Sequence, residues 1–246
     1  MNTTRFPALA GVVCAAVLCV GCGSSASEEP QADGPAATAA VDSPSPSAPA
    51  APTADPDVVP GSVLKTYLPT NRTLPKGWKV STAFTEHDSG PKPVAPSADP
   101  GAAANFGCDQ LSEHGTEGAL GGWGAYANLG VTDPHAHEVG VMVRAYSAGQ
   151  ASEAFGNLRS LEGLCGTTYE PNSAGLLNNP VTITVSAVDG IGDEGVRITI
   201  DRKAYVGRET VVTRVGDRLL SVSSDNDGGK FADVMKLAKA LTPRVK

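Results

Sequence analysis

The last third of the chain alternates polar and apolar residues in successive segments, and no other pattern narrows the choice of fold as much. Residues 181–188 and 195–203 each repeat with a period of two, and residues 209–224 form two more such runs that meet at Gly216 and Asp217. Gly-Asp pairs supply the positive φ angles that tight hairpin turns need. The pattern therefore predicts consecutive antiparallel strands, each with one face on a core.

A period of three to four residues marks two helices. Residues 230–245 carry five apolar side chains on one helical face, and residues 148–165 carry another five. The first set is Phe231, Val234, Met235, Ala238 and Leu241, and the second is Ala151, Ala154, Phe155, Leu158 and Leu161. Both segments are therefore expected to pack one face against a sheet.

Further elements complete the expected domain. Residues 121–131 and 137–147 read as strands, and residues 105–115 as a short helix. Runs of antiparallel strands with helices along one face form α+β layered domains. We expect an α+β fold, with a twisted antiparallel sheet and helices packed on one face. By length, residues 61–246 form one domain that can bury a core.

The N-terminus has the parts of a secretory signal peptide. Arg5 supplies a positive charge, and residues 8–20 form an apolar run shorter than the ~20 residues of a bilayer span. The run ends in Cys-Val-Gly-Cys, which resembles a bacterial lipobox. Residues 1–21 are thus predicted as a lipoprotein signal peptide and Cys22 as the lipidated mature N-terminus, anchored by its acyl chains. Plain secretion with cleavage near Ala26 is the alternative.

Residues 22–60 are rich in Ser, Ala, Pro and acidic residues and offer almost nothing to bury. Such a segment cannot offset its ordering entropy, so a disordered tether is expected. The whole chain has 19 basic and 26 acidic residues, for a net charge of −7. That balance argues against nucleic acid as a partner.

The cysteines divide between the signal region and the domain. Cys14, Cys19 and Cys22 belong to the former, and only Cys108 and Cys165 to the latter. A redox or zinc pair formed by Cys19 and Cys22 is disfavoured because the two lie at the edge of a cleavable segment. In an exported protein the remaining two are expected to form a disulfide, with two buried free thiols as the alternative.

Two short motifs suggest chemistry but have simpler explanations. His135 and His137 would share one face of a strand, which suits metal binding, but nothing fixes a third ligand and a polar turn explains them equally. Ser62 and Lys65 match the Ser-x-x-Lys word of penicillin-interacting enzymes, yet the Lys-Thr-Gly word is absent. We therefore expect no catalytic residues, metal or cofactor.

Several short sequence motifs, taken together, resemble those of a known protein family. Residues 74–78 read Leu-Pro-Lys-Gly-Trp, residues 192–194 read Gly-Asp-Glu, and two cysteines, a hairpin and a final amphipathic helix surround them. The arrangement resembles actinobacterial lipoproteins with the extracellular sensor domain of PknH-type serine/threonine kinases. The resemblance implies an α+β domain with a ligand-binding cleft. The kinase domain has two disulfides, whereas Cys108 and Cys165 can form only one.

The sequence thus favours a lipid-anchored, extracytoplasmic binding or sensor module without catalytic activity. It would attach to the outer face of the cytoplasmic membrane and bind a small molecule, a cell-wall fragment or a membrane partner. Two alternatives remain: an envelope hydrolase with a site near His135 and His137, and a purely structural envelope lipoprotein. Substitution of both histidines separates the enzyme from the sensor.

Overall fold

The structure, a computed structural model, describes five stretches of the C-terminal part of the chain. They all belong to one compact unit, Pro49–Lys246. The described stretches are residues 53–96, 115–171, 177–202, 206–225 and 232–245. The predicted signal peptide, most of the predicted tether and the segment around Cys108 lie outside them.

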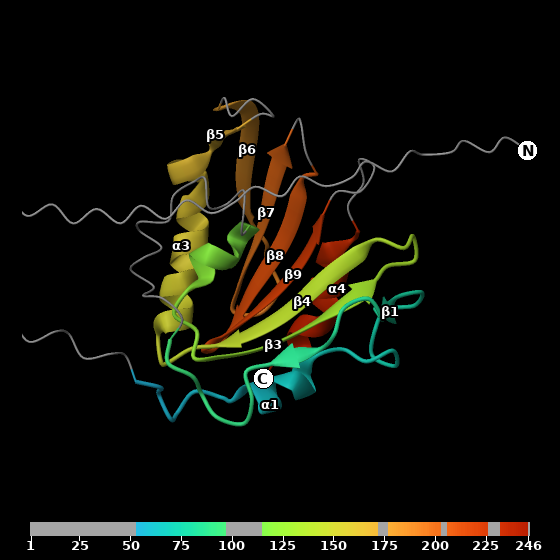
Figure 1. The fold of residues 1–246 in the computed structure, drawn as a ribbon, viewed down its shortest axis with the longest axis vertical. Coiled ribbons are helices and arrows are strands. Elements are labelled where there is room, and N and C mark those ends of the chain that lie inside the picture. Colours follow the sequence, from blue (N-terminus) through green and yellow to red (C-terminus); the bar gives the residue numbers. More distant parts are fainter. Residues whose placement is uncertain (1–52, 97–114, 172–176, 203–205, 226–231, 246) are drawn as a thin grey trace, which may run out of the picture. The chain divides into compact units, whose positions relative to one another are not determined.

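The described strands form one antiparallel sheet of nine members (Figure 1). They are β1 (Lys79–Val80), β2 (His87–Asp88), β3 (Ala125–Thr132), β4 (Glu138–Ala145), β5 (Thr167–Pro171), β6 (Leu177–Ala187), β7 (Glu194–Arg202), β8 (Arg208–Val215) and β9 (Arg218–Asp225). Their order is β1-β3-β4-β9-β8-β7-β6-β5, and β2 also pairs with β3. The last five strands form a meander, and its final strand pairs with β4 to attach the β3–β4 hairpin.

Three α-helices and three 3-10 helices accompany the sheet in the described part. They are α1 (Gly61–Leu64), α3 (Gln150–Cys165), α4 (Val234–Leu241), η1 (Lys65–Tyr67), η3 (Gly115–Leu120) and η4 (Thr242–Arg244). The predicted α+β class and antiparallel sheet are confirmed. The predicted stripe of α3 is buried as expected, whereas in α4 Leu237 is buried and Met235 only half-buried.

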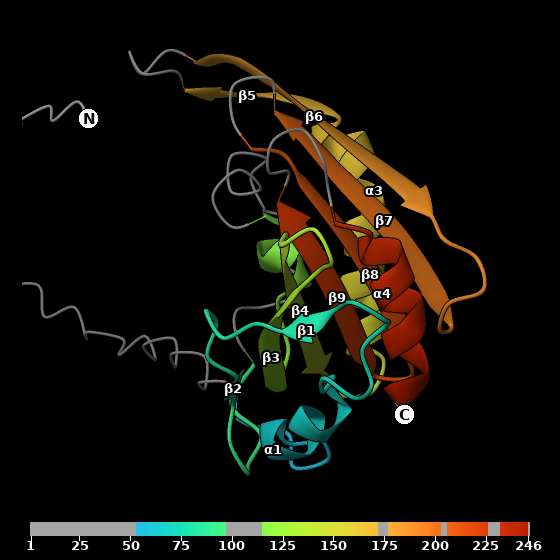
Figure 2. The same ribbon diagram turned by 90° about the vertical axis from the view of Figure 1, so that its right-hand side faces the viewer.

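The two long helices cover opposite faces of the sheet, not one face as the sequence suggested (Figure 2). Val211 and Val212 are neighbours on β8, so their side chains point to opposite faces. Val211 belongs to the hydrophobic cluster that contains α4, and Val212 to the cluster that contains α3. We call these the α4 face and the α3 face. The correction has a simple reason: a strand with apolar residues on both faces needs a cover on each.

Each helix covers only part of its face. The α4 face is apolar on β3, β4 and β9, where Val141 and Val222 lie opposite each other in the register. The α3 face is apolar on β6 and β7, where Ile183 pairs with Ile200. Away from α3, the same face of β3, β4 and β9 carries mainly small or polar residues beside Met142, among them Asn128, Gly130, Gly140, Ser221 and Ser223. This part of the sheet carries the candidate site.

The folded part begins before the expected boundary at residue 61. Val58 is buried in the core and packs against Gly124. Trp78 is also buried in this core, and Gly77 before it has a φ of +89° and packs against Pro134. The Leu-Pro-Lys-Gly-Trp segment is therefore a structural anchor for the β3–β4 turn.

Candidate functional site

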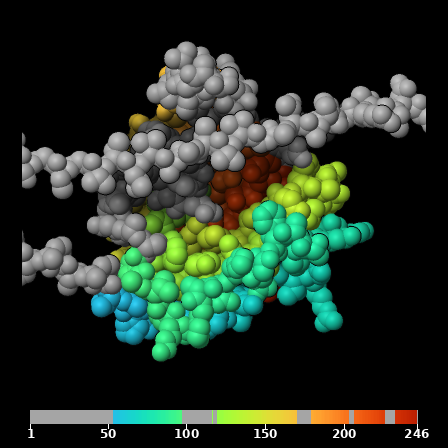
Figure 3. Space-filling view, viewed as in Figure 1, coloured from blue at the N-terminus to red at the C-terminus, as the bar shows by residue number. Residues whose placement is uncertain are grey.

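A cavity of about 280 Å³ opens on the α3 face of β3, β4 and β9, and we call it the trough. Its lining residues are Ala83, Phe84, Thr85, His87, Asn128, Leu129, Gly130, Gly140, Val141, Met142, Ser221 and Ser223. Figure 3 shows this side of the molecule, with β9 (red) exposed beside β4 (yellow-green). The trough combines three strands with the segment between β1 and β2.

The floor of the trough has two glycines in one row of the sheet, of which Gly130 is covered by the Phe84 ring and Gly140 is not. Gly130 and Gly140 face each other across β3 and β4, and Ser223 of β9 continues the same row. A glycine inside a strand weakens it and often marks a place where another group approaches the backbone closely. Two glycines in one row therefore create a flat depression in a sheet whose other face is a packed core.

Residues 82–86, which we call the strap, form one wall of the trough. The strap is held at its start by Ser81, whose backbone N–H donates to the Gly130 carbonyl at 2.9 Å. At its end the Glu86 carboxylate pairs with Lys65 at 2.7 Å. Between these points the Phe84 ring lies on Gly130, and a Cβ added at Gly130 would come within 2.6 Å of the ring. Only glycine at position 130 leaves room for this aromatic wall.

Phe84 is unusual because it is a large apolar side chain that stays 55% exposed. Its ring lies beside the trough and not in either hydrophobic core. Leaving a phenylalanine half in water forgoes about 1 kcal/mol or more of burial. Such an exposed ring beside a cavity is a candidate contact for a ligand.

The polar walls offer both kinds of hydrogen-bonding group. The Asn128 side-chain oxygen is buried and has no hydrogen-bond partner within the described structure. Ser221 Oγ accepts from Arg144 Nη1 at 3.2 Å, which leaves the hydroxyl proton of Ser221 free to donate. A buried oxygen without a partner costs about 1–3 kcal/mol. Because this oxygen has almost no exposed surface, a ligand in the trough reaches it only if the Asn128 side chain moves.

A second cavity, of about 650 Å³, contains the two histidines singled out from the sequence. They lie in the turn between β3 and β4, where Ala136 has a φ of +69°, and not on a strand face. Asp133 organises this turn: its Oδ1 accepts from the backbone N–H groups of His135 and His137, and its Oδ2 lies 3.0 Å from His137 Nδ1. The expected strand geometry was wrong, and the polar-turn interpretation describes these residues.

Burial raises the pKa of Asp133, but the hydrogen bonds from His137 and from the two backbone N–H groups outweigh it and hold this pKa below 3.8. Its carboxylate is thus fully engaged inside the turn. Within the described residues no three His, Cys, Asp or Glu side chains are grouped to hold a metal ion. Within the described part of the chain, His135 and His137 therefore have no third metal ligand beside them. The sequence had not identified such a ligand either.

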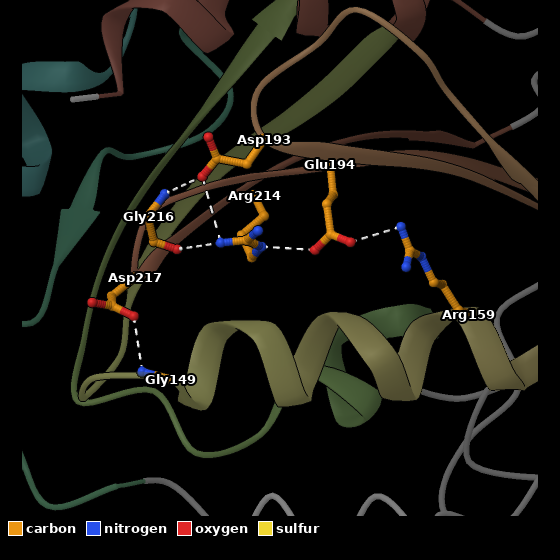
Figure 4. Close-up of polar contacts among 7 residues, drawn as sticks. All are labelled: Gly149, Arg159, Asp193, Glu194, Arg214, Gly216 and Asp217. Carbon is orange, nitrogen blue, oxygen red and sulfur yellow. Dashed lines mark hydrogen bonds and ion pairs between the residues drawn. The ribbon is translucent and has the colours of Figure 1, made fainter.

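The Gly-Asp-Glu motif at residues 192–194 links β7, β8 and α3 (Figure 4). Glu194 pairs with Arg214 of β8 and with Arg159 of α3, each at 2.8 Å. Asp193 Oδ2 accepts from the Gly216 backbone N–H at 2.7 Å. The hydrogen bond from Arg214, the largest influence, lowers the pKa of Glu194 despite its partial burial. This motif is a structural clamp on the β8–β9 hairpin.

The structure tests the predicted site residues only in part. Cys22 and Cys108 lie outside the described residues, so lipidation and the partner of the disulfide stay predictions. Cys165 is buried at the end of α3 and is disulfide-bonded. The sequence did not identify the trough, although the glycines of residues 121–131 were a signal that this strand was unusual.

Among the described helices none is both long and apolar enough to cross a membrane. No family model and no curated protein matches the chain. In fold, the chain is similar to the crystal structure of the extracellular domain of PknH from Mycobacterium tuberculosis. The two share 15% identity with a TM-score of 0.44, over 78% of this chain and 98% of that one. Membership of the sensor-domain family that the sequence resembles stays a prediction.

Proposed function

We propose that this protein is a lipid-anchored, extracytoplasmic binding module that holds a small ligand in the trough and has no catalytic activity. The observation that carries the proposal is the trough itself, with the glycine pair of its floor and its half-exposed Phe84. A sheet that served only as a scaffold would gain stability by filling this depression with side chains. A ligand explains why the floor is open.

A fragment screen by ligand-observed NMR on the full chain tests binding. Gly140→Val is the decisive variant, because a Cβ at this position would stand over the floor and meet only Ser223, at 3.2 Å from Oγ and 3.9 Å from the backbone oxygen. Fragments that bind the wild type and lose their signal with Gly140→Val support the proposal. If no fragment distinguishes the two proteins, the trough is not a binding site.

The anchor rests on the lipobox-like end of the signal peptide and on the following tether. A lipoprotein purified from its own membrane should begin at Cys22 and carry a diacylglyceryl adduct, seen by intact-mass analysis. Cys22→Ser should release the protein from the membrane fraction. An unmodified chain cleaved elsewhere would overturn the anchoring.

The histidine turn supports a second candidate, an envelope hydrolase. Asp133 and His137 form a carboxylate–imidazole pair that could activate water. The cavity beside them is lined by Trp78, Pro134, His135, Asp233 and Lys236 as well, without a serine or cysteine among its described lining. Turnover of chromogenic esters that disappears in His137→Ala would favour this enzyme. Equal background rates in both proteins would favour the binding module.

A further inference from the structure

One position on the floor of the trough carries no side chain, and we call the space above it the Gly140 socket. Its walls are the Phe84 ring, which lies on Gly130 of β3, Ser223 of β9, and the Met142 side chain of β4. Among the described atoms, a Cβ built at Gly140 would meet only Ser223 within 4 Å. Neither Phe84 nor Met142 therefore fills the socket, and a ligand can enter it without moving them.

The spacing of the sheet sets the width of the Gly140 socket. Neighbouring strands lie about 4.8 Å apart, so a group above Gly140 is about that far from the group above Gly130. The Phe84 ring occupies the position above Gly130. Aromatic pairs prefer about 4.5–7 Å between their ring centroids. An aromatic ring in the socket would therefore lie at a favourable distance from Phe84.

Met142 forms the end wall of the Gly140 socket. It is two residues from Gly140 on β4, so both face the same side of the sheet, about 6.8 Å apart along the strand. The Met142 side chain is half-buried, and its flexible thioether can reach toward the socket. Methionine sulfur makes favourable contacts with the edge of an aromatic ring at about 5 Å. Met142 therefore favours an aromatic ring over a saturated ring of the same size.

The polar and charged groups limit the ligand further. The described lining of the trough contains neither a carboxylate nor a lysine or arginine side chain. A charged ligand would lose its hydration without gaining an ion pair, which is costly. Ser223 Oγ would be 3.2 Å from a Cβ at Gly140, so this hydroxyl borders the socket. A hydroxyl both donates and accepts, and it can therefore bind one polar group on a neutral ring.

We propose that the Gly140 socket binds a single neutral aromatic ring with one polar group, of the phenol or indole type. The ring would pack beside Phe84, contact Met142 with its edge and form a hydrogen bond to Ser223 Oγ. This chemistry can come from a free small molecule or from a tyrosine or tryptophan side chain of a peptide. The inference rests on the proposed function and names its class of ligand.

NMR of methionine methyl groups labelled with carbon-13 gives a local readout on the full chain. The chain has three methionines, Met1, Met142 and Met235. Met235 lies on α4 and packs against the core on the opposite face of the sheet, so it is an internal control. Indole and para-cresol should shift the Met142 signal through their ring currents and leave the Met235 signal in place. Met235→Leu assigns the signals.

Substitutions locate the ring. Gly140→Val should abolish the ligand-induced shift of Met142, because its side chain occupies the socket. Phe84→Leu keeps an apolar wall but removes the aromatic ring, and it should weaken binding about threefold to tenfold. Phe84→Tyr should bind like the wild type. Tyr169→Ala should also leave binding unchanged, because Tyr169 is an aromatic residue of similar exposure, 53%, on β5 at the far edge of the sheet.

Two further probes define the chemistry. Cyclohexanol has a saturated ring and a hydroxyl, and it should bind more weakly than para-cresol. N-acetyltryptophanamide carries the indole ring on a peptide unit. Binding of this probe at least as tight as that of indole identifies a peptide side chain as the source of the ring, and tighter binding of indole identifies a small molecule.

The outcomes separate this inference from the proposed function. Cyclohexanol that binds as tightly as the aromatic probes overturns it, and so does a Met142 shift that persists in Gly140→Val. If no aromatic probe shifts Met142 while other fragments still respond to Gly140→Val, the aromatic ring is wrong and the binding site stands. If no compound responds, both proposals fall.

Discussion

Gly192 occupies a position where the backbone conformation and the surrounding space both require glycine. It has a φ of +62°, and a Cβ there would collide with the backbone carbonyl of Arg214. We expect Gly192→Ala to lower the free energy of unfolding by about 1–3 kcal/mol, from strain and from displacement of the Gly-Asp-Glu clamp. Urea denaturation measures this.

Gly190 is the matched control for that experiment. It also has a positive φ, +74°, but a Cβ there would meet nothing within 4 Å. Gly190→Ala should therefore cost only the local backbone preference, about 1–2 kcal/mol at most. Equal losses in the two variants would mean that the close approach to Arg214 contributes nothing.

Asp133 should make stability depend on acid pH. Its folded pKa lies below 3.8, so its hydrogen bonds stabilise the fold above that value and the contribution is lost as pH falls through the folded pKa. We expect the difference in urea midpoint between wild type and Asp133→Asn to be largest near neutral pH and to shrink below about pH 4. Asp189→Asn, at an exposed position of the β6–β7 turn, should show no such change. A constant difference from pH 2 to 7 would contradict the assignment.

At the level of elements, α4 depends on its buried face. Leu237 is fully buried, and α4 packs on β8 and β9. Leu237→Ala should reduce the free energy of unfolding by about 2–5 kcal/mol, through lost burial and the cavity left behind. Lys239→Ala, on the exposed side of the same helix, should change it by less than about 0.5 kcal/mol. Thermal and urea unfolding of both variants decide the matter.

The elements predicted best from the sequence were those with a regular period. β7, β8, β9 and α3 appear close to their expected bounds, because alternation and the spacing of Ala151 to Leu161 directly report which face is buried. β6 begins four residues before its expected start at residue 181, and β5 was not predicted. The sequence could not show which face of the sheet each helix covers. That arrangement follows from β8, where adjacent valines are both apolar, and a period of two does not distinguish the faces.

The trough was harder to predict because it forms where two strands carry glycines in place of larger side chains. Gly130 and Gly140 lie 10 residues apart in the chain, and they become neighbours only through the β3–β4 register. Phe84 lies in a segment without regular secondary structure. No periodic pattern in the sequence therefore indicated that its ring packs on Gly130. The prediction that His135 and His137 lie on one face of a strand was wrong for a related reason. The hydrogen bonds of Asp133 stabilise a turn where the alternating pattern suggested a strand.

For the whole domain, the disulfide is the main long-range covalent constraint that the sequence predicts. If Cys108 and Cys165 are partners, the bond closes a long loop and contributes about 4 kcal/mol. Cys108→Ser, Cys165→Ser and the double variant should then lose nearly the same stability, because one bond is lost in each case. Denaturation of the three variants, with and without reductant, measures this. Losses that add in the double variant would show that the cysteines act separately.

The floor of the trough has a packed core directly behind it. Leu129 and Val141 lie on the α4 face of the same strands whose α3 face carries Gly130 and Gly140. Substitutions at Gly140 or Ser223 therefore change what can rest there without replacing a residue of that core, whereas Phe84 restricts position 130 to glycine. Related chains could diversify at the floor and the strap while keeping one scaffold, so that what they recognise would evolve faster than how they fold.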